Sequence, residues 1–168
     1  MIIRPAQDMD RPIIAEIHAR SWQENYRNVL SPALLDEKIP GLMADHWSKA
    51  VIGAQDIVLV AEDHAIQGFV AAWDNDSVYV DNLHVRSACQ SQGTGRKLLT
   101  AAANIAQQNG RQSMWLHVVV GNDRARKLYT KLGGEPDGTE NKDLYGTMVP
   151  NERILWRDIN ILAKQPNQ

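Results

Sequence analysis

The pattern of the chain changes at Asp56. Upstream of this residue, apolar side chains recur mainly at helical spacing, whereas downstream they gather in short runs that are typical of strands. Three such runs follow one another, at residues 56–63, 67–74 and 77–85. The first two flank a polar turn around His64, which predicts a β-hairpin. Three consecutive strands argue against a Rossmann-type nucleotide-binding fold, in which strands and helices alternate.

Further segments extend this pattern to the order β–α(α)–β–β–β–α–β–α–β–β. Helices are predicted at residues 10–21, in pieces over 23–55, at 95–110 and at 122–134. The remaining strands are predicted at residues 2–5, 112–120, 143–149 and 153–162. We therefore expect an α/β (α+β) protein with a mixed sheet flanked by helices. One domain is expected over residues 1–160, with 161–168 as a frayed tail.

Charge and cysteine content narrow the classes of function. The 168 residues include 18 basic and 20 acidic side chains, and this near balance gives no support for nucleic-acid binding. Cys89 is the single cysteine, and the histidines show no ligand spacing, so we expect no metal site. The chain has neither a signal-peptide pattern nor an apolar run long enough for a membrane span, which predicts a cytoplasmic protein without a membrane partner.

One segment places a strand, a glycine-containing loop and a helix in order. Gly93 and Gly95 stand where the helix begins, and Arg96 and Lys97 follow in its first turn. Glycines let the backbone approach a ligand, and the free N–H groups of a helix N-terminus attract phosphate. The segment lacks the third glycine of a dinucleotide fingerprint and the Gly-Lys-Ser/Thr of a Walker loop. It therefore indicates either an anion-binding loop of another kind or an ordinary turn before a helix.

The chain carries two motifs on either side of the strand predicted at residues 112–120. The first is the run Gln90-Ser91-Gln92-Gly93-Thr94-Gly95, which follows Leu83-His84-Val85, and the second runs from Asn122 to Gly133. They resemble the two signatures of the GNAT acetyltransferases, Gln/Arg-x-x-Gly-x-Gly/Ala and Asn-x-x-Ala-x-x-Leu/Phe-Tyr-x-x-x-Gly, and Leu83-His84-Val85 lies where that family has its pantetheine-binding strand. The family commonly has proline, glycine and phenylalanine where this chain has Ser87, Ser91 and Gly134.

The resemblance implies a GNAT fold, which is a mixed, mostly antiparallel, twisted sheet with a splayed pair of strands. Acetyl-CoA is the implied cosubstrate, and its pantetheine arm would bind between the splayed strands like an added strand. A backbone N–H near Leu83 would then face the thioester oxygen. The implied cofactor-binding residues are Leu83, His84, Val85, Gln90, Ser91, Gln92, Gly93, Thr94, Gly95, Arg96, Lys97, Asn122 and Tyr129.

Several of these side chains also have a plain structural interpretation. Tyr129 could belong to the apolar stripe of its helix, but the family match makes it the general acid that protonates the leaving thiolate of coenzyme A. Asn122 is a plausible helix cap as well as a contact to pantetheine. Cys89 borders the loop and has no activating base in the sequence, so we expect it to be a bystander.

The base that deprotonates the amine is open between two residues and a water relay. Strand alternation predicts Tyr79, Asp81 and Leu83 on one face, and related enzymes place a base at positions that match Tyr79 or Asp81. His117 interrupts an apolar strand at a position where some relatives carry glutamate. A core histidine with satisfied hydrogen bonds is the plain alternative for His117.

The acceptor is the least defined part of the prediction. Trp22 and Tyr26 lie four residues apart on one predicted helical face, either as core or, with Tyr79, as the wall of an acceptor pocket. We expect an N-acetyltransferase that acts on a primary amine, carried by a small molecule or a protein, by direct attack on the thioester. A non-catalytic acyl-CoA-binding or sensing domain is the alternative, and a homodimer is left open.

Overall fold

The computed structural model describes residues 1–90 and 92–163. The strands are β1 (Ile2–Pro5), β2 (Ile57–Asp63), β3 (Ala65–Trp73), β4 (Val78–Val85), β5 (Met114–Val119), β6 (Glu135–Leu144) and β7 (Thr147–Trp156). The helices are α1 (Arg11–Asn25), α2 (Ile39–Lys49), α3 (Thr94–Gln108), α4 (Asp123–Lys131) and α5 (Asn160–Ala163). Short helical segments are η1 (Asp8–Asp10), η2 (Ala33–Lys38) and η3 (Ser87–Cys89).

A seven-stranded sheet in the order β1-β2-β3-β4-β5-β7-β6 forms the centre of the molecule. Its strand pairs are antiparallel apart from β4 and β5, which run parallel. The chain enters β5 through α3, since parallel neighbours need a crossover connection. The predicted mixed, mostly antiparallel sheet flanked by helices is confirmed.

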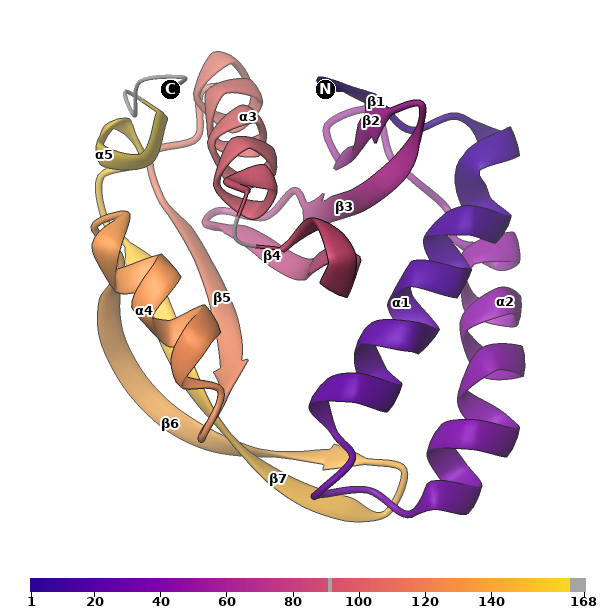
Figure 1. Cartoon of the computed structure of the whole chain (residues 1–168). Coiled ribbons are helices and arrows are strands. Elements are labelled where there is room, and N and C mark those ends of the chain that lie inside the picture. Colours follow the sequence, from indigo (N-terminus) through magenta and orange to yellow (C-terminus); the bar gives the residue numbers. More distant parts are fainter. Residues whose placement is uncertain (91, 164–168) are drawn as a thin grey trace.

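Two hydrophobic clusters fill the two faces of the sheet. One joins buried residues of β2–β5 and β7 to α3, α4 and α5, and the other joins β2 and β3 to α1, η2 and α2. Figure 1 shows α1 and α2 together at one end of the sheet and α4 in front of β5, β6 and β7 at the other. Strand alternation explains both layers, because successive residues of β2 and β3 belong to opposite clusters.

The carboxy-terminal part differs from the predicted strands. Residues 143–149 do not form one strand, because Tyr145 and Gly146 make the turn of the β6–β7 hairpin with φ of 52° and 86°. Positive φ at both central residues suits the twist of a two-residue hairpin turn. β6 escaped prediction because it is an edge strand of mostly exposed polar residues with no apolar alternation.

The last predicted strand, 153–162, is also wrong, since β7 ends at Trp156 and α5 follows. Leu162 and Ala163 of α5 are buried in the main cluster, so the packed structure extends past residue 160. The rest of the predicted tail, 164–168, lies outside the described residues. None of the described helices is long and apolar enough to cross a membrane.

Candidate active site

The parallel strands β4 and β5 pair over only a short stretch and then separate. Their register covers Val78–Val80 against Met114–Leu116, after which β4 stays paired with β3 and β5 with β7. A cavity of about 1120 Å³ is lined by the separated ends of both strands together with parts of α1, α3 and α4. The separation leaves one backbone edge of each strand free to bind a ligand as an added strand.

A β-bulge at Asp81 determines which backbone groups face this gap. The N–H of Val78 donates to Ser113 beside β5 (3.1 Å), whereas that of Arg86 donates to Gln67 on β3 (2.8 Å). Val78 and Arg86 are eight residues apart, so their N–H groups would point to the same neighbouring strand in a regular strand. They point to opposite neighbours because the register shifts by one residue at Asp81. The backbone groups of successive residues in a strand point alternately to its two sides. Leu83 is three residues before Arg86, so its N–H and carbonyl point away from β3 and into the gap.

The same bulge makes the predicted side-chain alternation wrong. Tyr79, Asp81 and Leu83 do not share a face, because the extra residue reverses the alternation between Tyr79 and Leu83. Leu83 packs against the cluster of α3, while Tyr79 stacks on Trp115 (ring centroids 4.3 Å apart) on the opposite face. Tyr79 thus faces the part of the cavity that α1 also lines.

The glycine-containing loop meets this gap at the start of α3. Gly93 is the N-cap with φ of 80°, a left-handed conformation that favours glycine. Gln90 donates to the carbonyl of Val85 (3.0 Å) and accepts from the guanidinium of Arg124 on α4, so it bridges the two sides of the cavity. Thr94, Gly95 and Arg96 of the first turn of α3 line the cavity, and the N-terminus of a helix attracts phosphate.

Three of the predicted cofactor-binding residues are not found in the described part of the cavity wall. Gln92 and Lys97 are not among the residues that line the cavity, and Ser91 lies outside the described residues. The cavity lining does include the others, namely Leu83, His84, Val85, Gln90, Gly93, Thr94, Gly95, Arg96, Asn122 and Tyr129.

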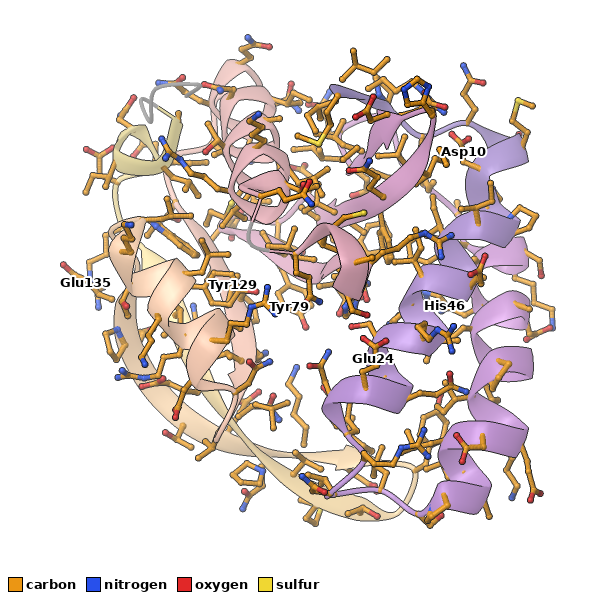
Figure 2. All side chains as sticks on the ribbon, viewed as in Figure 1. Asp10, Glu24, His46, Tyr79, Tyr129 and Glu135 are labelled. Carbon is orange, nitrogen blue, oxygen red and sulfur yellow. The ribbon has the colours of Figure 1, made fainter. Side chains whose placement is uncertain are left out.

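Tyr129 points from α4 toward the middle of the molecule (Figure 2). It is 7% exposed, lines the cavity, and makes no hydrogen bond through its hydroxyl to any described residue. Burial raises its pKa to about 12, so the hydroxyl keeps its proton at neutral pH. Asn122 caps the same helix by accepting from the N–H of Ala125 (3.2 Å), which confirms its predicted capping role.

Trp156 supports Tyr129 from behind. The two rings meet edge to face with centroids 6.2 Å apart, and the indole N–H of Trp156 donates to the carbonyl of Leu132 (3.0 Å). A Cβ atom on Gly134 would lie 2.5 Å from Ile154 and 2.8 Å from Trp156. The glycine at position 134 therefore leaves room for the indole, where the family commonly has phenylalanine.

His117 and Asp81 both line the cavity but have different partners. His117 is largely buried, and its Nε2 lies 2.8 Å from Oε1 of Glu140, while its Nδ1 is buried without a partner in the described part of the chain. Burial lowers the pKa of His117, so the ring is mainly neutral at pH 7. A carboxylate only accepts, hence Nε2 carries the proton and Nδ1 has the free lone pair. Asp81 is exposed and accepts from Trp73 (3.0 Å) and Asn82 (3.1 Å).

Aromatic and histidine side chains form the wall of the cavity on the side of α1. Trp22 and Tyr26 lie 4.7 Å apart between ring centroids, and Tyr145 from the β6–β7 turn comes to 6.0 Å from Trp22. His18 stacks on His84 at 4.8 Å, although the sequence suggested scattered histidines. Within the described residues no group of histidine, cysteine and acidic side chains is arranged to hold a metal ion.

Sequence reasoning missed Glu140, Asn82 and Tyr145. Glu140 and Tyr145 come from the hairpin that the sequence pattern did not delineate, and neither belongs to a motif. Asn82 lies between the named Asp81 and Leu83, and its role depends on a bulge that no single residue signals.

The separated parallel strands, the glycine-containing loop at the start of α3 and a tyrosine whose hydroxyl has no partner among the described residues are together the features of an acyl-CoA-binding transferase site. The acetyltransferase (GNAT) family model matches residues 13–134, so the chain belongs to this family, as the motifs predicted.

Proteins of similar sequence are N-acetyltransferases, in agreement with this assignment. A [ribosomal protein bS18]-alanine N-acetyltransferase of Haemophilus ducreyi is 36% identical over 93 residues, which is 52% of this chain and 64% of that protein, so the chain spans less than two thirds of this relative. The uncharacterized N-acetyltransferase YuaI of Bacillus subtilis is 25% identical over 99% of this chain and 98% of its own length.

Solved structures show the same fold at low identity. A ribosomal-protein-alanine N-acetyltransferase from Brucella melitensis has a TM-score of 0.69 at 19% identity, covering 93% of this chain and 99% of that one. A protein from Salmonella typhimurium, solved with acetyl-CoA, has a TM-score of 0.68 at 18% identity, covering 100% of this chain and 96% of that one.

Proposed function

We propose that this protein transfers an acetyl group from acetyl-CoA to a primary amine by direct attack on the thioester. The observation that carries the proposal is the gap between β4 and β5, which opens beside the N-terminus of α3 and is faced by Tyr129. Membership of the GNAT family supports the same reaction.

Each part of the gap suits one part of acetyl-CoA. The free edge of Leu83 and Val85 can pair with the pantetheine amides, and the first turn of α3 can bind the pyrophosphate. The N–H of Leu83 then donates to the thioester oxygen, where negative charge develops as the amine attacks. Tyr129 holds a proton that it can give to the departing thiolate.

His117 is the residue that we expect to take the proton of the amine. Its ring is mainly neutral at pH 7, and Glu140 fixes the tautomer in which Nδ1 is the acceptor. We propose that a water molecule carries the proton to Nδ1, which has no partner among the described residues. Asp81 is the poorer candidate, because its Oδ2 already accepts hydrogen bonds from Trp73 and Asn82.

Relatives are named for both protein and small-molecule acceptors, including thialysine and streptothricin. We propose that Trp22, Tyr26 and Tyr79 contact the acceptor, because all three line the cavity on the side away from α3.

An acetylation screen tests the proposed function. The protein is incubated with acetyl-CoA and with single amines: a peptide with a free N-terminal alanine, lysine, spermidine and benzylamine. Release of free thiol above the rate without amine is expected for at least one of them. Tight coenzyme A binding without thiol release from a broader amine panel would favour the acyl-CoA-binding or sensing alternative.

A further inference from the structure

We propose that the side-chain carbonyl oxygen of Asn82 binds the acceptor amine beside the reacting thioester, and that Asp81 acts through Asn82 as a positioning residue. The proposal rests on the N-acetyltransferase activity proposed above and names the residue that holds the acceptor. It gives Asp81 a role other than that of a general base.

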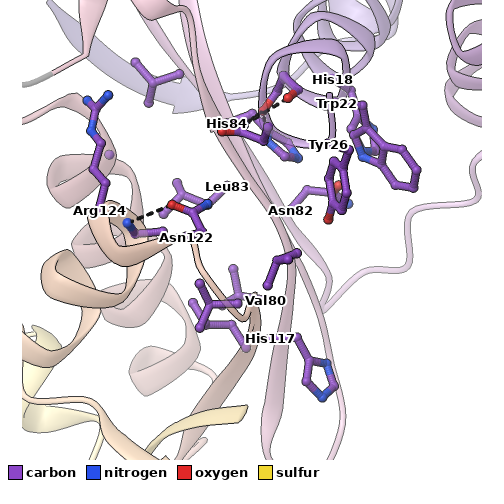
Figure 3. Close-up of a pocket in the computed structure, with 18 of the residues that line it drawn as sticks. His18, Trp22, Tyr26, Val80, Asn82, Leu83, His84, His117, Asn122 and Arg124 are labelled. Atoms are coloured by element: carbon purple, nitrogen blue, oxygen red, sulfur yellow. Dashed lines mark hydrogen bonds between the residues drawn. The ribbon is translucent and has the colours of Figure 1, made fainter. Parts of the chain in front are cut away.

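Asn82 is a buried polar residue on the wall of the cavity. It is 5% exposed and lines the cavity directly after the bulge of β4. Its partner in register is Ala71, which belongs to the cluster of α1 and α2, so the side chain of Asn82 lies on the face toward α1. In Figure 3 the side chains of Asn82 and Tyr26 point toward the same part of the cavity.

The orientation of the Asn82 amide follows from its neighbour. Its Nδ2 lies 3.1 Å from Oδ2 of Asp81, and a carboxylate accepts hydrogen bonds but donates none. The NH₂ group must therefore face Asp81, and the carbonyl oxygen must face the other way. The indole N–H of Trp73 holds the same Oδ2 at 3.0 Å, which fixes the carboxylate in turn.

The carbonyl oxygen of Asn82 accepts no hydrogen bond from any described residue. This oxygen is not among the fully buried side-chain atoms, so it is accessible from the cavity, where a ligand can donate a hydrogen bond to it. A primary ammonium group has only donors to offer, which matches this acceptor. The negative charge of Asp81 on the far side of the amide strengthens the carbonyl as an acceptor for a cation.

The position of Asn82 fits the geometry of attack. The next residue, Leu83, turns its backbone N–H into the gap, where it can meet the thioester oxygen. A nitrogen that donates to the carbonyl of Asn82 therefore lies close to the carbon that it attacks. An amide does not take the proton, so proton removal stays with His117 and water.

The first test observes amine binding without catalysis. Protein labelled with ¹⁵N is saturated with coenzyme A and titrated with n-butylammonium or with tetramethylammonium, which has the same charge but no N–H donor. We expect n-butylammonium to shift the side-chain NH₂ resonances of Asn82 and tetramethylammonium to leave them in place. Equal shifts from both cations would overturn the proposal, because charge alone would then explain binding.

Variants provide the second test. Asn82→Leu keeps a similar size and removes the carbonyl, so the Kd for n-butylammonium should rise roughly ten- to hundredfold, as for other hydrogen bonds to charged groups. Asp81→Asn should also raise this Kd. An amide at position 81 can donate as well as accept, so it no longer holds the amide of Asn82 in the orientation that presents its carbonyl to the amine. The exposed Asn141 provides the matched control, and Asn141→Leu should bind like the wild type. Coenzyme A affinity should stay unchanged in all three.

Failure of the proposal differs from failure of the proposed function. Wild-type n-butylammonium affinity in both Asn82→Leu and Asp81→Asn would reject the role of Asn82, whatever the enzyme acetylates. If Asn82→Leu does not fold, Asp81→Asn alone decides. Amine binding at Asn82 without thiol release from the broader amine panel would instead reject the transferase activity. For an acetylated amine, Asn82→Leu should raise the KM of the amine and not that of acetyl-CoA.

Discussion

A tyrosine that acts as an acid must keep its proton until negative charge develops beside it. Tyr129 meets this condition, because burial raises its pKa to about 12 and its hydroxyl has no partner among the described residues. Trp156 holds the ring from behind, so the hydroxyl keeps its place without a hydrogen bond of its own. At the residue scale, packing therefore prepares Tyr129 for proton transfer.

Tyr129→Phe should lower kcat by about 10²–10⁴-fold, the usual contribution of a general acid or base. The ring and its contact to Trp156 remain, so the KM for acetyl-CoA should change little. Steady-state kinetics on an amine from the screen measures both constants. Full turnover by this variant would return Tyr129 to a purely structural role.

His117 should control the acidic limb of the pH–rate profile. A base works in its neutral form, so the rate should rise with pH through the pKa of His117, which burial lowers below its usual value near ~6.5. His117→Gln should flatten this limb and lower the rate, while Asp81→Asn should keep the limb. If Asp81→Asn flattens the acidic limb and His117→Gln does not, Asp81 and not His117 is the base.

The element that organises the site is β4. Its first residues join the parallel pair, the bulge at Asp81 reverses its alternation, and its last residues offer a free edge to the gap. The loop that follows leads into α3, which begins at Gly93. One strand and the start of one helix thus provide most of the acetyl-CoA contacts that we propose.

Gly95→Val tests this loop at the scale of the element. A Cβ atom at position 95 would meet Leu128 at 3.7 Å and Val85 at 3.8 Å, which are ordinary contacts, and the Tm of the variant checks whether the two methyl groups of valine are also accommodated. The larger side chain would project where the backbone must approach the pyrophosphate. Calorimetry should show weaker coenzyme A binding with a similar Tm. Unchanged affinity in the folded variant would show that this loop is not the binding site.

At the scale of the whole molecule, the β6–β7 hairpin connects the two ends of the sheet. Figure 1 shows it passing from α4 toward the end of α1, where Tyr145 meets Trp22 and Leu144 packs against the cluster of α1 and α2. On the same side, His18 connects α1 to α2 and β4 through Trp47 (3.1 Å) and His84. The wall of the cavity on the side of α1 therefore depends on contacts between distant parts of the chain.

His18 should make the protein less stable in acid. Burial lowers its pKa to about 2, whereas the unfolded chain has the usual ~6.5. Above the pKa of the unfolded chain the ring is neutral in both states. Below that pKa the unfolded chain binds a proton that the folded chain does not. The free energy of unfolding should therefore fall by about 2 kcal/mol from this residue alone between pH 7 and pH 5.

Urea denaturation at the two pH values measures this fall. His18→Leu should reduce the difference between pH 7 and pH 5, although it removes contacts to Trp22 and Trp47 at both. His64 is exposed, so His64→Gln should leave the difference as in the wild type. An undiminished difference in His18→Leu would assign the acid sensitivity to other groups.

The sequence alone predicted the family, the order of elements as far as α4 and the position of the glycine-containing loop. These depend on local signals, because helical spacing, alternation and glycine at a helix start are written into consecutive residues. Asn122 illustrates this, since its cap lies where the motif predicts it. The edge strand β6 shows the limit, because an exposed strand has no apolar alternation to detect.

Only the tertiary structure decided which way the side chains of β4 face and which distant residues meet them. The bulge at Asp81 shifts the register against β3, and nothing in residues 77–85 marks it, because a bulge depends on pairing with the neighbouring strand. Glu140 reaches His117, and Tyr145 reaches Trp22, because the hairpin folds back across the sheet. Contacts between residues far apart in sequence leave no local pattern, so the acceptor side of the cavity could be read only from the folded chain.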